Sequence, residues 1–425
     1  MHTKLLKKRV IYQNQFLYTS SNAIGPHFLS GAESDPDGTL RNSDNALKPL
    51  FRVQSLDYGF KTNFSRLNEY GQAGNVGSVS LNNPDISCSF EYLLLDGYNE
   101  RCLDFIINGI HSALHPFVSN QFPLGKNLFF ISGPAGYDLI GVDLGSVQDQ
   151  IDVVAIGNAF LSQYAITAEV GSLPKARVAF EAFNIRSFSK EIQNLPLPSI
   201  EPAKNCAESN YKFSIPDVLD TTSYESYANS YNEISLSELS QGILPGSIRL
   251  DIDDGSLITK QNKGENSFDQ GGAHIQGFTI NFPLGSTRVK RMGNVFDFAR
   301  VYNFPSTIEV KITAIVSELK SANLFSSLCK SKKHNIVISM HDHCSVSLCE
   351  NKLKQEDASI ILYLRGALID TEAFNSSVDG SSKLVEISLS LPVASPDSNC
   401  DEGFFMFGKS FFPSSPKIVA WGQPL

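Results

Sequence analysis

Residues 53–60 read VQSLDYGF, and residues 275–282 read IQGFTINF. The two stretches lie 222 positions apart, residue 275 against residue 53. Further matches at this offset are Arg66 with Arg288 and Gly71 with Gly293. Matches that keep their order under one constant offset are rare by chance, so they predict two copies of one structural unit.

Each stretch is followed by a segment in which apolar and polar residues alternate, at residues 86–94 and 308–316. Period-two alternation predicts a strand with one face in the core and the other in water. The residues expected on the wet faces are Ser87, Ser89, Glu91, Glu309, Lys311 and Thr313.

The offset then changes to 208, residue 335 against residue 127, and it extends to Lys175 and Lys383. The first copy therefore carries 14 more residues than the second, between about residues 94 and 126. Further strands are predicted at residues 127–132, 153–156, 176–183, 248–252, 336–340, 359–364 and 384–391.

A helix is predicted at residues 99–114, where apolar residues recur at spacings of three and four. Its counterpart in the second copy is residues 318–329. Each copy is thus predicted to consist of strands around one helix, and the fold class is mostly β.

The prolines at residues 194–202 predict a stiff, extended connector between the copies. We expect a first domain at 1–190, a connector with an irregular insertion at 191–240, and a second domain at 241–425. A length of 425 residues suits two domains.

The composition excludes several classes of protein. A formal charge of −9 argues against a protein that grips the nucleic-acid backbone. No apolar run is long enough to span a membrane, and residues after the basic start are too polar for a secretory leader. The seven cysteines lack paired spacing, which favours reduced thiols made in a cytoplasm.

Three segments superficially suggest ligand sites. Residues 132–137 resemble a phosphate loop but lack its Gly-Lys-Ser/Thr ending, which favours a turn. Residues 341–344 carry metal-ligand types, yet His341 and Cys344 would point to opposite faces of a strand, which favours a solvated loop. Asp251, Asp253 and Asp254 resemble half of a calcium loop without its closing glutamate. We predict no catalytic residue, metal or cofactor, and no enzymatic activity.

The block 52–94 resembles tail tube proteins of long-tailed bacteriophages. The shared features are the order of residues 53–55, Tyr58, Phe60, Arg66, Gly71 and Pro84, then the alternating strand. The second copy has the same order in residues 275–316, and residues 157–184 resemble the closing part of such a domain.

This resemblance implies a virion structural protein of the duplicated-domain type. Its two tandem tail-tube-like domains would each be a β-sandwich or barrel with one flanking helix. Six such domains form a ring, so a homotrimer would close a pseudo-hexameric ring whose inner sheets join into a β-barrel. Rings stack into a tube through which DNA passes during ejection without specific binding. The candidate ring-stacking arms carry Arg66, Gly71, Arg288 and Gly293, and the six wet-face residues would be on the lumen side.

Other tail proteins are expected partners, such as tip, terminator and sheath, and the location is the virion tail, assembled in the host cytoplasm. Two alternatives stay open. One is a tail-tip or baseplate hub of the same fold. The other is a carbohydrate- or receptor-binding β-sandwich of the virion, for which the Tyr-rich residues 211–231 would suit a binding surface.

Overall fold

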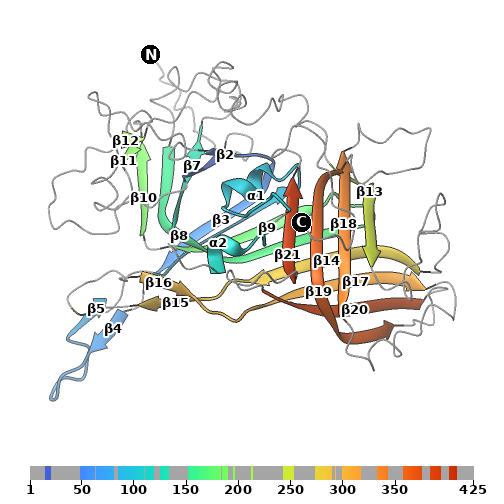
Figure 1. Ribbon diagram of the computed structural model, residues 1–425. Helices are drawn as coiled ribbons and strands as arrows, with labels where there is room; N and C mark the ends of the chain where they lie inside the picture. Colours follow the sequence, from blue (N-terminus) through green and yellow to red (C-terminus); the bar gives the residue numbers. More distant parts are fainter. Residues whose placement is uncertain are drawn as a thin grey trace, which may run out of the picture.

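The computed structural model describes residues 15–20, 48–62, 64–80, 85–109, 111–118, 125–133, 152–182, 184–189, 195–196, 212–213, 243–252, 273–289, 292, 299–316, 333–342, 358–375, 383–393 and 402–408. These residues form strands and two short helices, α1 (Tyr98–Cys102) and α2 (His115–Val118) (Figure 1). The predicted fold class, mostly β, is confirmed.

The strands up to residue 189, here called the first repeat, form two sheets. Its inner sheet has the order β3-β6-β9-β8, and its outer sheet has the order β10-β8-β7-β1-β2. The bounds are β1 (Gln15–Ser20), β2 (Lys48–Leu50), β3 (Val53–Lys61), β6 (Asp85–Leu93), β7 (Lys126–Ser132), β8 (Asp152–Glu169), β9 (Lys175–Ala182) and β10 (Asn184–Ser189).

The strands from residue 243 onward, here called the second repeat, pair in the same way. The inner sheet has the order β14-β17-β20-β19, and the outer sheet has the order β21-β19-β18-β13. The bounds are β13 (Ile243–Ile252), β14 (Ala273–Pro283), β17 (Thr307–Val316), β18 (His334–Asp342), β19 (Ala358–Asn375), β20 (Lys383–Pro392) and β21 (Gly403–Gly408).

In each repeat one long strand, β8 or β19, belongs to both sheets. The register with the inner neighbour shifts by one residue at Ser162 in β8 and at Asp370 in β19, which are equivalent at the offset of 208. A second shift falls at Gln54 and Gln276, equivalent at the offset of 222. Such bulges bend a strand, and they let β8 and β19 turn from one sheet into the other.

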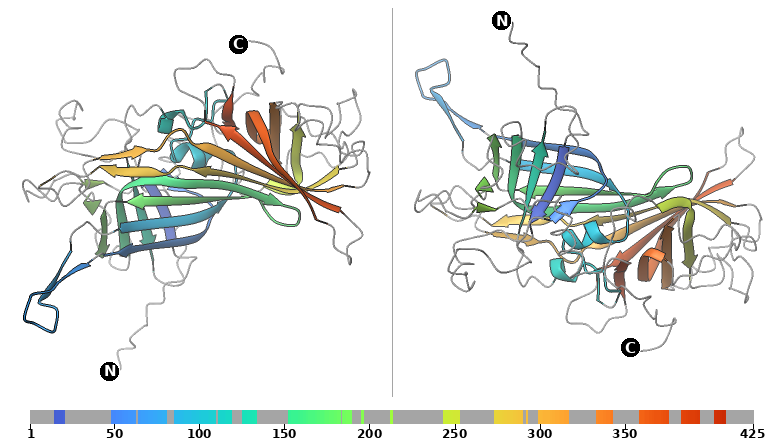
Figure 2. Two further views of the ribbon diagram at one scale, coloured as in Figure 1. Left: turned by 90° about the horizontal axis from the view of Figure 1, so that it is seen from below. Right: turned by 90° about the horizontal axis from the view of Figure 1, so that it is seen from above.

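The two inner sheets are joined edge to edge within the chain. β8 pairs with β14 from Gln163 opposite Pro283 to Glu169 opposite Gly277. The shared sheet therefore has the order β3-β6-β9-β8-β14-β17-β20-β19, and in Figure 2 its colours pass from blue and green to yellow and orange.

The ends of this shared sheet are β3 and residues 371–375 of β19, here called the two free edges. Neither has a strand partner on its outer side among the described residues. The barrel expected from the sequence is thus not closed within one chain.

Short hairpins extend from the inner strands. β4 (Phe64–Leu67) pairs with β5 (Gly77–Ser80), and β15 (Ser286–Val289) pairs with β16 (Ala299–Tyr302). The β4–β5 hairpin projects away from the rest of the chain (Figures 1 and 2). Within the predicted connector and insertion, β11 (Leu195–Pro196) pairs with β12 (Lys212–Phe213).

The helix predicted at residues 99–114 is wrong. α1 ends at Cys102, Asp104 and Gly109 adopt left-handed φ angles of 70° each, and α2 begins at His115. The apolar spacing arises instead from burial, since Leu103 and Ile107 reach the core without helical backbone. The predicted counterpart at 318–329 lies outside the described residues.

The match of Lys175 with Lys383 is one residue out. Lys175 pairs with Leu93, and the equivalent position Ile315 pairs with Leu384. The equivalent of each β9 residue in β20 therefore lies 209 positions later.

One hydrophobic core runs through both repeats. At its centre a row of aromatic rings crosses the junction, the place where β8 pairs with β14. The ring centroids are 4.6 Å apart for Phe105 and Tyr164, 5.6 Å for Tyr164 and Phe282, and 4.6 Å for Phe282 and Phe404. In the part of the chain that the structure describes, no helix is long and apolar enough to span a membrane.

Candidate functional site

The polar face of the shared sheet carries the residues that the sequence places on the wet side. Ser87, Ser89 and Glu91 alternate with buried residues of β6, and Glu309, Lys311 and Thr313 do so in β17. Glu91, Glu309 and Lys311 line a hollow of about 480 Å³ that lies across the junction of β8 with β14. The alternation thus identifies one continuous surface built from both repeats.

Charges of both signs share this face. The acidic residues at described positions are Asp57, Asp85, Glu91, Glu169, Glu181, Glu309 and Glu386, and the basic residues are Lys61, Lys175, Arg177 and Lys311. Its ion pairs are long and exposed, as between Arg177 and Glu91 (4.0 Å) and between Lys311 and Glu386 (3.9 Å). Because these side chains are exposed, the face is polar and solvated, and such pairs contribute little to stability.

A short polar ladder crosses the junction on the same face. Gln163 Nε2 donates to Asn281 Oδ1 (2.9 Å), and Asn281 Nδ2 donates to Glu309 Oε2 (3.4 Å). These three side chains come from β8 of the first repeat and from β14 and β17 of the second, so hydrogen bonds connect the two repeats on this face.

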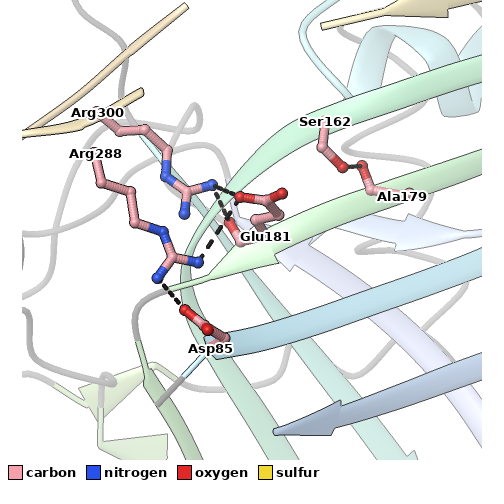
Figure 3. Close-up of polar contacts among 6 residues, drawn as sticks. All are labelled: Asp85, Ser162, Ala179, Glu181, Arg288 and Arg300. Atoms are coloured by element: carbon pink, nitrogen blue, oxygen red, sulfur yellow. Dashed lines mark hydrogen bonds and ion pairs between the residues drawn. The ribbon is translucent and has the colours of Figure 1, made fainter. Parts of the chain in front are cut away.

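At one end of the junction two arginines of the second repeat meet two carboxylates of the first (Figure 3). Arg300 Nη1 donates to Glu181 Oε2 (2.7 Å), and Arg288 lies between Asp85 and Glu181. The Arg300 side chain is fully buried and its guanidinium lies 5.5 Å from the Phe160 ring, whereas Glu181 is half exposed. The base of the β15–β16 hairpin is thereby fixed over the ends of β6 and β9.

A third contact between the repeats involves the residues around α1 and α2. Gly109 N donates to Met406 O (2.9 Å), Ala113 N donates to Phe404 O (2.8 Å), and Gly408 N donates to Ile107 O (3.2 Å). This first-repeat segment therefore covers β21, the edge strand of the second outer sheet. The repeats are held together by strand pairing, an ion cluster and backbone hydrogen bonds.

The free edge at β3 differs from the equivalent strand β14. Ile280 and Phe282 of β14 are 0% and 1% exposed, whereas Tyr58 and Phe60, at the same positions of β3, are 42% and 66% exposed. β14 is covered by β8, and β3 has no such neighbour among the described residues. The β3 edge thus presents backbone groups and large apolar side chains together.

Beneath the first repeat's inner sheet lies a buried acid. Glu100 of α1 accepts hydrogen bonds from Tyr92 Oη (2.8 Å) and Tyr164 Oη (3.0 Å). Burial raises the pKa of Glu100 above its ordinary value, and the two tyrosine hydrogen bonds oppose this only in part. All three side chains are buried, so the network is part of the core.

The predicted arm residues lie in different surroundings. Arg66 is exposed on β4, and Gly71 is in the turn region beyond it with a left-handed φ of 91°. Arg288, by contrast, is engaged in the ion cluster of the junction. Gly293 lies outside the described residues. Tyr70 and Met292, equivalent at the offset of 222, are both fully exposed.

The weak ligand motifs contribute no site among the described residues. No group of three or more potential metal ligands occurs there. The interpretation of His341 as part of a solvated loop is wrong, because His341 lies in β18 and is buried. Asp251 is in β13, while Asp253, Asp254, His343 and Cys344 lie outside the described residues.

The sequence did not indicate the ion cluster or its buried arginine. Arg288 is matched by Arg66, but the position equivalent to Arg300 is Ser78, so the repeat does not predict an arginine pair in the hairpin. An arginine among aromatic and small residues in 298–302 is the one signal present.

No family model matches the chain, and no curated protein matches it. Among solved structures, a chain of the PVC sheath–tube complex, an extracellular contractile injection system in its extended state, is 10% identical with a TM-score of 0.25, over 41% of this chain and 99% of that one. The SPP1 tail tube is 9% identical with a TM-score of 0.26, over 48% and 99%. The anti-feeding prophage cap, which terminates the AFP tube, is 10% identical with a TM-score of 0.25, over 42% and 96%. At these TM-scores the likenesses carry no weight for function.

Proposed function

We propose that this protein is a structural subunit of a bacteriophage tail tube. Three chains, each with two tube domains, close a ring of six repeats, and the rings stack around a lumen. The polar face of the shared sheet lines this lumen, and DNA passes through it during ejection without specific binding. The chain is then located in the virion tail with other tail proteins as neighbours.

The observation that carries the proposal is the contrast between β3 and β14. The same strand position is covered by β8 inside the chain and exposed at the free edge. Fully burying a phenylalanine stabilises by about 1.5–3 kcal/mol, and an unpaired strand edge is a template for another strand. Residues 371–375 of β19 are equivalent to the part of β8 that covers β14. They are the natural partner for β3 of a second chain.

The register of this pairing follows from the junction inside the chain. Ala165 of β8 lies opposite Asn281 of β14, and the equivalent residues are Ala373 and Gly59. We therefore expect Ala373 of one chain opposite Gly59 of the next. A closed ring uses every such edge, so assembly stops at a defined size in the plane.

The charges of the polar face agree with a conduit. Acidic side chains outnumber basic ones at its described positions, and the cations lie among carboxylates. A lumen of this kind would make few lasting contacts with phosphates, whereas a basic lumen would retain DNA.

The decisive experiment is electron microscopy of the purified chain, with the native mass of single rings. We expect rings and tubes with three chains per ring. Six chains per ring, or a protein that stays monomeric at high concentration, would refute the proposal.

A deletion of residues 65–76 tests the stacking arm separately. It removes most of the β4–β5 hairpin, including the exposed Tyr70, and leaves the shared sheet in place. We expect folded, soluble subunits that cannot stack into tubes. Long tubes formed by this variant would exclude the hairpin from stacking.

The same images of the unmodified chain distinguish a tube subunit from a tail-tip hub. If the unmodified chain forms single rings only, a tail-tip hub is favoured over a tube.

A further inference from the structure

The ion cluster at the junction inside the chain has an equivalent set of positions at the free edges. The hairpins β4–β5 and β15–β16 correspond residue by residue at the offset of 222. Arg66 thus takes the position of Arg288, and Ser78 takes that of Arg300. The first repeat's hairpin carries one arginine where the second repeat's hairpin carries two.

The surface that receives the hairpin changes in the same sense. Inside the chain the acceptors are Asp85 at the start of β6 and Glu181 near the end of β9. By strand pairing their equivalents in the second repeat are Thr307 and Ser390, neither of which carries a charge. The second repeat therefore lacks the two carboxylates that bind Arg288 and Arg300 in the first repeat.

One carboxylate is nevertheless present there, at a different position. Asp370 forms the bulge of β19, is exposed, and accepts a hydrogen bond from Ser390 Oγ (2.8 Å). Its equivalent in the first repeat is Ser162, which donates to Ala179 O (3.1 Å) on β9, the strand that also carries Glu181 (Figure 3). Asp370 thus lies on the strand beside Ser390, the residue of the second repeat that is equivalent to Glu181.

Charge balances at both places. Inside the chain two arginines, Arg288 and Arg300, meet two carboxylates. Between chains one arginine, Arg66, would meet one carboxylate, Asp370. Arg66 is exposed and forms no ion pair with a described residue.

We infer that Arg66 of one chain forms an ion pair with Asp370 of the neighbouring chain, and that this pair fixes the docking of β3 on β19. The partner is a second copy of this chain. The inference rests on the proposed ring, in which residues 371–375 of β19 lie along β3. The pair stabilises the chain-to-chain contact in the way that the arginine cluster stabilises the contact inside the chain.

Charge reversal tests the pair. Arg66→Asp and Asp370→Arg each place like charges together, and each is expected to raise the concentration for half-assembly at least tenfold. The double variant restores the pair in the opposite sense and is expected to assemble within about threefold of the unmodified chain. Assembly is measured by sedimentation and native mass, and the melting temperature of the unassembled chain shows that each variant folds.

Asp152→Arg is the matched control. It makes the same charge change on an exposed residue of β8, in the outer sheet and away from both free edges. We expect unchanged assembly. Single reversals that assemble normally, or a double variant no better than the worse single one, would overturn the ion pair.

A disulfide assay separates this inference from the proposed ring. Gly59→Cys and Ala373→Cys in one chain lie on opposite edges of the shared sheet, so a bond between them joins two chains. Gly59 has open space for a side chain. If linked peptides are found while the charge reversals have no effect, the ring stands and the ion pair is wrong. If neither linked peptides nor rings form, both are wrong.

Discussion

The junction inside the chain and the two free edges are built from equivalent strands, which are paired at the junction and unpaired at the edges among the described residues. At the junction β8 covers β14, Phe282 is buried, and two arginines are neutralised by two carboxylates. At the β3 edge the equivalent side chain, Phe60, is two-thirds exposed, and Arg66 is exposed. The strands themselves differ little, so what differs is the presence of a neighbour. The strand position that is covered at β14 is left open at β3 among the described residues.

Matched truncation of the two phenylalanines is expected to have the largest effect. Phe282→Ala removes a buried ring from the aromatic contacts of the junction and should cost about 3–5 kcal/mol of unfolding free energy. Phe60→Ala in the unassembled chain should change it by about 0.5 kcal/mol or less. Chemical denaturation measures both. Similar losses at the two positions would mean that the chain itself covers Phe60.

Removal of either partner of the buried arginine should give unequal losses. Glu181→Ala leaves the Arg300 guanidinium buried without its carboxylate and should cost about 3 kcal/mol. Arg300→Met keeps an apolar side chain over Phe160 and leaves Glu181 half hydrated, so about 1 kcal/mol is expected. Thermal denaturation gives the order of the two. The reverse order would show that Glu181 is not the acid that compensates Arg300.

Two glycines sharpen the comparison at the level of backbone approach. A Cβ atom at Gly277 would lie 2.8 Å from Ala168 O across the junction, so Gly277→Ala should destabilise by about 1–3 kcal/mol. Gly59 at the free edge has no atom within 4 Å of such a Cβ, so Gly59→Ala should stabilise the unassembled chain by about 0.4–1 kcal/mol. Opposite signs in the unfolding free energies are the expected result. Equal signs would argue against an open β3 edge.

The smallest expected effect is a change in pH dependence that belongs to the first repeat alone. The folded-state pKa of Glu100 is raised, so the folded chain holds its proton more tightly than the unfolded chain does. Stability that is present below the unfolded pKa is therefore lost as pH rises toward the folded pKa. Glu100→Gln keeps an oxygen acceptor for Tyr92 and Tyr164 and should flatten this decline.

Denaturation at a series of pH values measures this slope. Glu169→Gln is the matched control, because Glu169 is exposed at the end of β8. An unchanged slope in Glu100→Gln would assign the pH dependence to other groups. The second repeat has Ala314 in place of Tyr92, so it lacks this hydroxyl donor.

The sequence predicted those strands whose pattern is regular and failed where a bulge or burial disturbs it. Residues 86–94 and 308–316 alternate without interruption, and both are strands. β8 and β19 were predicted only as residues 153–156 and 359–364, because the bulges at Ser162 and Asp370 break the period of two. The alternation of apolar and polar residues changes phase at a bulge, so a local pattern does not predict that the strand continues through it.

The site was predictable to a similar extent. The wet-face residues followed from alternation, since each depends only on its own strand. The pairing of β8 with β14 and the burial of Arg300 depend on residues more than 100 positions away, as in Arg300 with Glu181. Helical spacing at residues 99–114 was misleading, because core burial without helical backbone gives the same apolar pattern.

The covalent link between β8 and β14 has a consequence for the order of the assembly reaction. Two strands of one chain meet at an effective concentration that is set by the connection between them and not by protein supply. In the proposed ring, half of the junctions are therefore complete as soon as each chain folds. Closing the ring would depend on the third power of chain concentration, where six separate domains would require the sixth. In the proposed ring, a two-repeat chain would therefore form closed rings at a lower concentration than separate domains would.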